Sequence, residues 1–74
     1  MKITIQAKGN GQAKEVDIKL REVYGQVNLI VDRQAVKGYP EYRTTAEYTQ
    51  RNYGLNEAQM MELYRDYRED YDNQ

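Results

Sequence analysis

The chain has 74 residues and carries 11 basic and 12 acidic side chains, so its net charge is −1. This length allows one small domain with a modest hydrophobic core, to which oligomerisation or a partner could add burial. The sequence contains no histidine, cysteine or serine, which removes the usual nucleophiles, the usual near-neutral general base and most transition-metal ligands. We therefore expect no enzyme activity, no metal site and no bound cofactor.

The first residues of the chain alternate between polar and apolar side chains and do not resemble a signal peptide. The longest apolar run, residues 29–31, is far too short to cross a membrane. The absence of cysteine fits a reducing compartment. Together these observations predict a cytoplasmic protein with no membrane partner.

Three segments of the first half alternate between apolar and polar residues, with the period of strands buried on one face. Their apolar positions are Ile3, Ile5 and Ala7, then Val16, Ile18 and Leu20, then Val27, Leu29 and Val31. The residues between them, Gly9-Asn10-Gly11 and Gly25, tolerate the positive φ angles of hairpin turns. We therefore expect a three-stranded antiparallel β-meander over residues 1–38.

The second half is predicted to be helical. Gly38-Tyr39-Pro40 is expected to end the sheet, because Pro40 cannot donate a hydrogen bond to a ladder. Thr44 and Glu47 have the spacing of a capping box, so a first, short helix is expected to begin at Thr44 and to end at Gly54.

The last helix is better specified. Asn56 is a good N-cap with Gln59 three residues later, and Leu55 and Met60 occupy the two positions of a hydrophobic staple. One helix face carries apolar residues at spacings of three and four: Met60, Leu63, Tyr64, Tyr67 and Tyr71. With this helix covering the sheet, the fold is expected to be α+β, with order βββαα in two layers and a single domain over residues 1–74.

The two halves of the chain differ in charge and in aromatic content. Residues 1–40 carry seven basic and four acidic side chains, whereas residues 41–74 carry four basic and eight acidic ones. All eight aromatic residues are tyrosine, and seven of them lie within residues 39–71. Tyr64 and Tyr67 are expected to pack on the sheet. The remaining tyrosines exceed the available interior, so an exposed cluster bordered by arginine is predicted in residues 39–53.

This cluster and the carboxylates of the last helix form the candidate protein-binding surface. Tyrosine and arginine are enriched at binding hot spots, and carboxylates steer a basic partner. The candidate residues are Tyr39, Tyr42, Arg43, Tyr48, Arg51, Tyr53, Glu62, Asp66, Glu69 and Asp70. The first hypothesis is a non-enzymatic protein-binding module, with its site in the Tyr-rich acidic helical half, residues 39–74. Size and chemistry alone suggest an analogy with small inhibitors encoded by phages or mobile elements, which would engage a basic or nucleic-acid-binding protein.

Two alternatives remain open. The basic sheet face could bind nucleic acid weakly through Lys2, Lys8, Lys19 and Arg21, although Tyr24 is the only aromatic residue of residues 1–38 that could stack on a base. The tyrosine surface could instead mediate self-association into a homo-oligomer. A helix-turn-helix around Gly54 is disfavoured, because residues 56–72 carry six acidic and two basic side chains and would be repelled by DNA phosphates.

Overall fold

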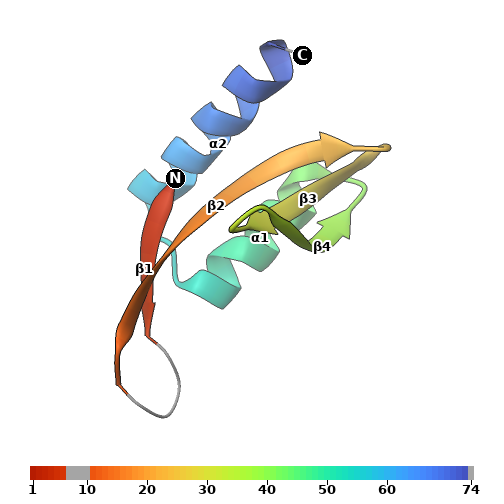
Figure 1. Cartoon of the computed structure of the whole chain (residues 1–74). Coiled ribbons are helices and arrows are strands. Elements are labelled where there is room, and N and C mark those ends of the chain that lie inside the picture. Colours follow the sequence, from red (N-terminus) through yellow and green to blue (C-terminus); the bar gives the residue numbers. More distant parts are fainter. Residues whose placement is uncertain (7–10, 74) are drawn as a thin grey trace.

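The computed structural model describes residues 1–6 and 11–73. The predicted strand position Ala7, the cation Lys8 and the turn residues Gly9 and Asn10 therefore lie outside the described residues. The elements are β1 (Lys2–Gln6), β2 (Ala13–Val23), β3 (Gln26–Val31), β4 (Gln34–Tyr39), α1 (Tyr42–Tyr53) and α2 (Glu57–Asp72) (Figure 1).

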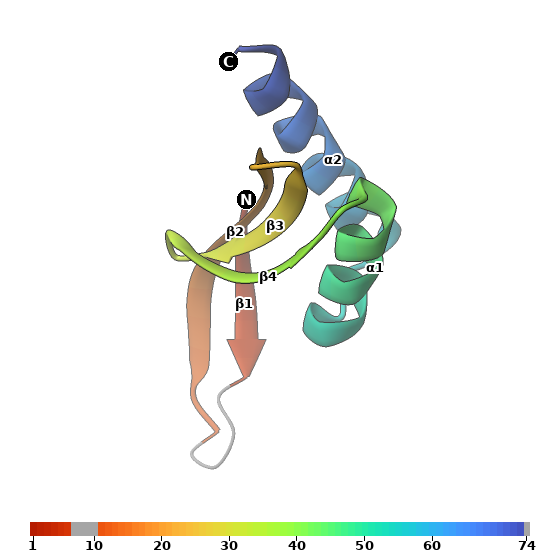
Figure 2. The same ribbon diagram turned by 90° about the vertical axis from the view of Figure 1, so that its right-hand side faces the viewer.

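The strands form an antiparallel sheet in the order β1-β2-β3-β4, and both helices lie on one side of it (Figure 2). The α+β class, the antiparallel sheet and the two helices are confirmed. The predicted number of strands is wrong, because the described part of the chain has a fourth strand, β4. The sheet therefore continues through Gly38 and Tyr39, where the sequence had indicated its end.

Two features hide β4 from a sequence pattern. Its first four residues are all exposed, so they show no apolar alternation. In the sequence, Gly38 indicates the end of a strand. In the structure it lies within β4, and its missing side chain leaves space on the outer sheet face for the side-chain amide of Asn28. A Cβ at residue 38 would clash with that amide.

The turns on either side of β3 each have two central residues with positive φ, as a type I′ hairpin turn requires. Tyr24 and Gly25 have φ angles of 53° and 79°, which confirms the turn predicted at Gly25. Asp32 and Arg33 have φ angles of 48° and 73°. This second turn contains no glycine, and it was therefore not predicted.

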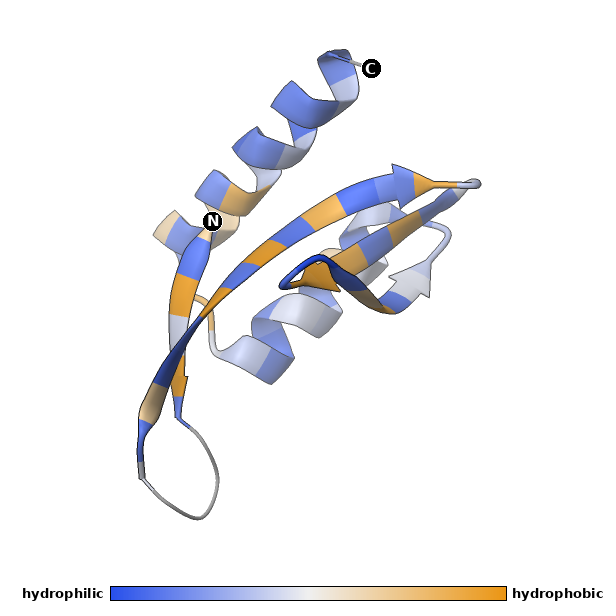
Figure 3. Ribbon diagram, in the orientation of Figure 1, coloured by the Kyte–Doolittle hydropathy of each residue, from blue (hydrophilic) through white to orange (hydrophobic). Residues whose placement is uncertain are grey.

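The core lies between the inner sheet face and the two helices. Apolar and polar residues alternate along β2 in Figure 3, and its Val16, Ile18 and Leu20 side chains are buried. The buried apolar side chains are Ile3, Val16, Ile18, Leu20, Val27, Leu29, Ala46, Leu55 and Leu63. Two buried threonines of α1 satisfy their hydroxyls internally: Thr45 Oγ1 donates to the Val27 carbonyl at 2.7 Å, and Thr49 Oγ1 to the Thr45 carbonyl at 2.8 Å.

Helix α1 begins earlier than predicted. Its N-cap is Glu41, which makes no side-chain capping bond, so the predicted capping box from Thr44 to Glu47 is wrong. Glu47 instead accepts a hydrogen bond from Arg43 Nε at 3.1 Å. The predicted end at Gly54 is confirmed, since Gly54 adopts the left-handed conformation with φ 63°.

Helix α2 has the predicted capping box. The backbone amide of Gln59 donates to Asn56 Oδ1 at 2.8 Å, and the backbone amide of Asn56 donates to Gln59 Oε1 at 2.9 Å. Of the two residues of the predicted staple, Leu55 belongs to the buried core cluster and Met60 packs against it. The N-terminus of α2 is therefore fixed by local interactions as well as by packing.

Replacing Asn56 by alanine is expected to lower the free energy of unfolding by about 1 kcal/mol, because the backbone amide of Gln59 loses its capping partner. Urea denaturation followed by circular dichroism measures this change. Asn73→Ala, at the other end of α2, serves as the matched control. An unchanged midpoint for Asn56→Ala would contradict the capping role.

Candidate protein-binding surface

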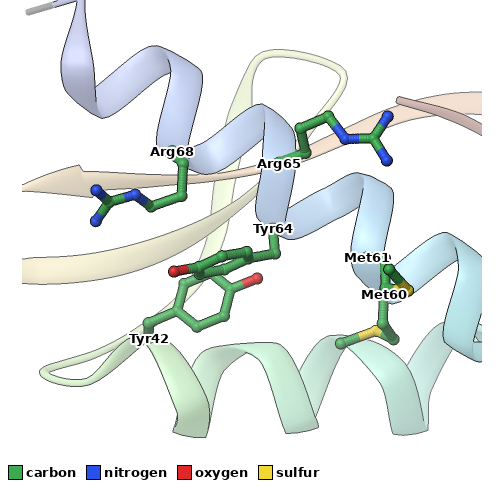
Figure 4. Close-up of a pocket in the computed structure, with 6 residues that line it drawn as sticks. All are labelled: Tyr42, Met60, Met61, Tyr64, Arg65 and Arg68. Atoms are coloured by element: carbon green, nitrogen blue, oxygen red, sulfur yellow. The ribbon is translucent and has the colours of Figure 1, made fainter.

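An apolar groove of about 590 Å³ opens between the start of α1 and one flank of α2 (Figure 4). Its lining residues are Tyr42, Met60, Met61, Tyr64, Arg65 and Arg68. Five of these six come from α2, where spacings of three and four residues place them along one flank. Because Tyr42 is the first residue of α1, the groove depends on how the two helices meet.

Ring contacts between four tyrosines connect the two helices. The Tyr42 ring lies 4.7 Å from the Tyr67 ring and 5.3 Å from the Tyr64 ring, measured between centroids, and the second pair is edge-to-face. Tyr67 continues the contact to Tyr71 at 6.2 Å. Such pairs contribute about 0.5–1.5 kcal/mol beyond the area that they bury. We call Tyr42, Tyr64, Tyr67 and Tyr71 the tyrosine chain.

Burial changes the acidity of two members of this chain. Burial, and to a smaller extent the neighbouring Tyr64 and Tyr67, raises the pKa of Tyr42 to about 12. Burial also raises the pKa of Tyr67, and Glu22 adds to that effect. Both phenols are therefore neutral near neutral pH, and Tyr42 contributes to the groove an apolar ring with a hydrogen-bonding edge.

The groove continues into exposed apolar side chains. Met61 is 66% exposed, and Tyr64 and Tyr71 are 49% and 48% exposed. Thioether and tyrosine side chains together make an adaptable surface, because methionine fits irregular partners and tyrosine adds rigid area. Of the two tyrosines predicted to pack on the sheet, Tyr67 is half-buried against the core as expected, but Tyr64 is not buried.

The predicted tyrosine cluster of residues 39–53 does not form one exposed patch. Tyr42 joins the tyrosine chain, whereas Tyr39 and Tyr48 form a separate half-buried pair with ring centroids 6.0 Å apart. Tyr53 is half-buried against the core. The two bordering cations, Arg43 and Arg51, are both exposed.

The predicted carboxylates lie on the other flank of α2. Asp66 and Asp70, expected on the exposed side, are half-buried in a hollow that they share with Met1 and β2. Asp66 Oδ2 lies 3.8 Å from the Met1 amino nitrogen, and Asp70 Oδ2 lies 3.7 Å from Arg21 Nε. Glu69 lines the same hollow, and Glu62 is exposed. Of the ten candidate residues, only Tyr42 lines the groove.

The other five lining residues of the groove were not among the candidate residues predicted from the sequence. Met60 and Tyr64 were assigned to the core stripe, and Met61 lies beside that stripe. The useful signal was the spacing of Met61, Arg65 and Arg68, which recur at four and three residues and therefore share a flank with the exposed tyrosines. That pattern places arginine, not carboxylate, next to the aromatic surface.

No family model, curated protein or solved structure matches this chain. Within residues 1–6 and 11–73, no group of three carboxylate, histidine or cysteine side chains is arranged to hold a metal ion. Neither of the described helices is both long and apolar enough to span a membrane. The functional proposal is therefore based on the geometry of the groove.

Proposed function

We propose that this protein is a non-enzymatic protein-binding module whose groove between α1 and α2 receives a segment of another protein. The observation that carries this proposal is an apolar groove of about 590 Å³ whose lining includes the partly exposed side chains of Met61 and Tyr64. The core is already closed by Leu63, Leu55 and the sheet, so these side chains are not needed to bury it. Contiguous exposed apolar surface rimmed by polar residues is typical of an interaction site.

The charges around the groove favour a partner with carboxylates. Arg65 forms no ion pair with any other described residue. Arg68 forms one ion pair among the described residues, with the exposed carboxylate of Asp72 at 3.8 Å. The basic partner expected from the sequence would contact tyrosines and carboxylates on one shared surface. In the structure, the groove tyrosines and the carboxylates lie on two different flanks of α2. For the groove we therefore propose an amphipathic helix that places apolar anchors between the helices and acidic residues beside the arginines.

Selection from a displayed library of helical peptides tests this proposal. The peptides carry fixed apolar residues at spacings of three and four and random charges elsewhere. We expect enrichment of aspartate and glutamate, and a loss of affinity of more than about 2 kcal/mol in the double variant Met61→Ala, Tyr64→Ala. Met61 is 66% and Tyr64 is 49% exposed, so the double variant should still fold, although it loses the contact between the Tyr64 and Tyr42 rings.

The matched control removes two tyrosine hydroxyls outside the groove, by Tyr39→Phe and Tyr48→Phe, and should leave the selected peptides bound. Enrichment of lysine and arginine would contradict the acidic partner. Peptides that bind the double variant as tightly as the wild type would contradict the groove as the site. Sedimentation of the free protein addresses self-association, because a dimer that dissociates on Tyr64→Ala would identify a second copy as the occupant.

A further inference from the structure

The sheet face opposite the helices is uncovered (Figure 2). It contains two hollows of about 370 and 310 Å³ that share Ile30 in their linings. The first extends to Arg33 in the turn between β3 and β4, and the second extends to Tyr24 in the turn between β2 and β3. Because β3 is six residues long, the two turns lie roughly 20 Å apart, at the two ends of one continuous surface.

Tyr24 and Arg33 both occupy backbone conformations that disfavour their side chains. Their φ angles of 53° and 73° lie in the left-handed region, where glycine, asparagine and aspartate are the favoured turn residues. Tyr24 is also fully exposed, so its ring gains nothing from packing. The fold is therefore not stabilised by either side chain, and such departures from local preference are typical of functional positions.

The free charge on this face is positive. Lys19 and Arg33 form no ion pair within the described residues. Of the two neighbouring carboxylates, Asp17 is paired with a cation, because its Oδ1 accepts a hydrogen bond from the Met1 amino group at 2.9 Å. Asp32 keeps its charge, and its Oδ1 accepts a hydrogen bond from the backbone amide of Asp17 at 2.9 Å. Arg21 adds a cation that is 3.7 Å from Asp70 and lines the hollow with Lys19.

We propose that this open face binds single-stranded nucleic acid. The Tyr24 ring is placed to stack on a base, while Lys19 and Arg33 contact phosphates along the strand. The side-chain amides of Gln26 and Asn28 line the hollow next to Tyr24, where they can hydrogen-bond to base edges. A duplex offers no unstacked base to Tyr24, so single strands are preferred. This surface lies on the opposite side of the sheet from the groove and is independent of it.

Two variants separate binding from folding. Tyr24→Asn and Arg33→Gly introduce residues that favour positive φ, so both should unfold at an equal or higher urea concentration than the wild type. We expect Tyr24→Asn to bind a fluorescent oligothymidine or oligouridine about tenfold more weakly. Arg33→Gly should also weaken binding and should reduce by about one the slope of log affinity against log salt concentration.

The matched controls are Tyr71→Gln and Arg51→Gln, which remove an exposed ring and a cation from the helical side and should leave oligonucleotide affinity unchanged. A duplex of the same length should bind more weakly than the single strand. The proposal is overturned if the wild type does not bind single strands at low salt, or if Tyr24→Asn binds them as tightly as the wild type. Equal affinity for inorganic polyphosphate in wild type and Tyr24→Asn, together with weaker oligonucleotide binding by the variant, would support the stacking contact.

Discussion

Replacing Leu63 by alanine is expected to lower the free energy of unfolding by about 2–5 kcal/mol. Leu63 is fully buried and is the only fully buried residue that α2 contributes in the described part of the chain. It lies in the same cluster as Leu20 of β2 and Leu29 of β3. A 74-residue chain without disulfides has a small total stability, so this loss should leave a large fraction of the protein unfolded at room temperature.

Urea denaturation monitored by circular dichroism measures the effect of Leu63→Ala. Met61→Ala is the matched control, because it also removes an apolar side chain from α2 but from a position that is 66% exposed. We expect the control to stay within about 0.5 kcal/mol of the wild type. Equal unfolding midpoints for the two variants would show that α2 does not close the core through Leu63.

The elements with strong periodicity were predictable from the sequence. Strands β2 and β3 alternate cleanly, since Ile18, Leu20 and Leu29 are buried on one face. Helix α2 carries its own boundary signal in the capping box from Asn56 to Gln59. In these segments, the residues that favour the strand or helix locally are also the residues that the core needs. The apolar pattern of the sequence therefore predicts both the element and its buried face.

The elements without such a pattern were not predictable. Strand β4 is held mainly by its ladder to β3, whose backbone hydrogen bonds leave no side-chain pattern in the sequence, and its glycine is explained only by the position of Asn28 on the neighbouring strand. The start of α1 is similar: Thr45 is buried because its hydroxyl reaches the Val27 carbonyl 18 residues earlier. Strand β4 and the start of α1 are therefore both determined by contacts between residues that are far apart in the sequence.

The groove that we propose as the binding surface lies in the half of the chain where the sequence placed the candidate residues, but it brings different side chains together. A helix pattern shows that Tyr64 and Asp66 lie on different flanks, but it does not show what each flank meets. In the structure, β1 pairs only with Ala13–Asp17 of β2, which leaves the later part of β2 with a free edge beside α2. Asp66 and Asp70 face that edge, so the tyrosines are left with the arginine flank.

The second large effect is expected at alkaline pH, where the protein should lose stability between about pH 10 and pH 12. Burial raises the pKa of Tyr42 from its ordinary value near 10 to about 12, because the ionised phenol would be poorly solvated between the helices. Below pH 10 both the folded and the unfolded protein keep this proton, so the contribution of Tyr42 is fully present. As the pH rises through 12, the unfolded state has already released the proton, and the contribution is lost.

The variant Tyr42→Phe isolates this effect, because it keeps the ring but has no proton to lose. The stability difference between wild type and Tyr42→Phe should be constant up to about pH 10 and should then shift against the wild type. The absorbance of tyrosinate should show one fewer late-ionising group in this variant. Tyr24→Phe is the control, since the Tyr24 side chain is fully exposed and its removal should not alter the alkaline part of the curve. Parallel stability curves for wild type and Tyr42→Phe would contradict a buried phenol between α1 and α2. They would also remove the geometric basis of the groove, because Tyr42 is the residue through which α1 contributes to it.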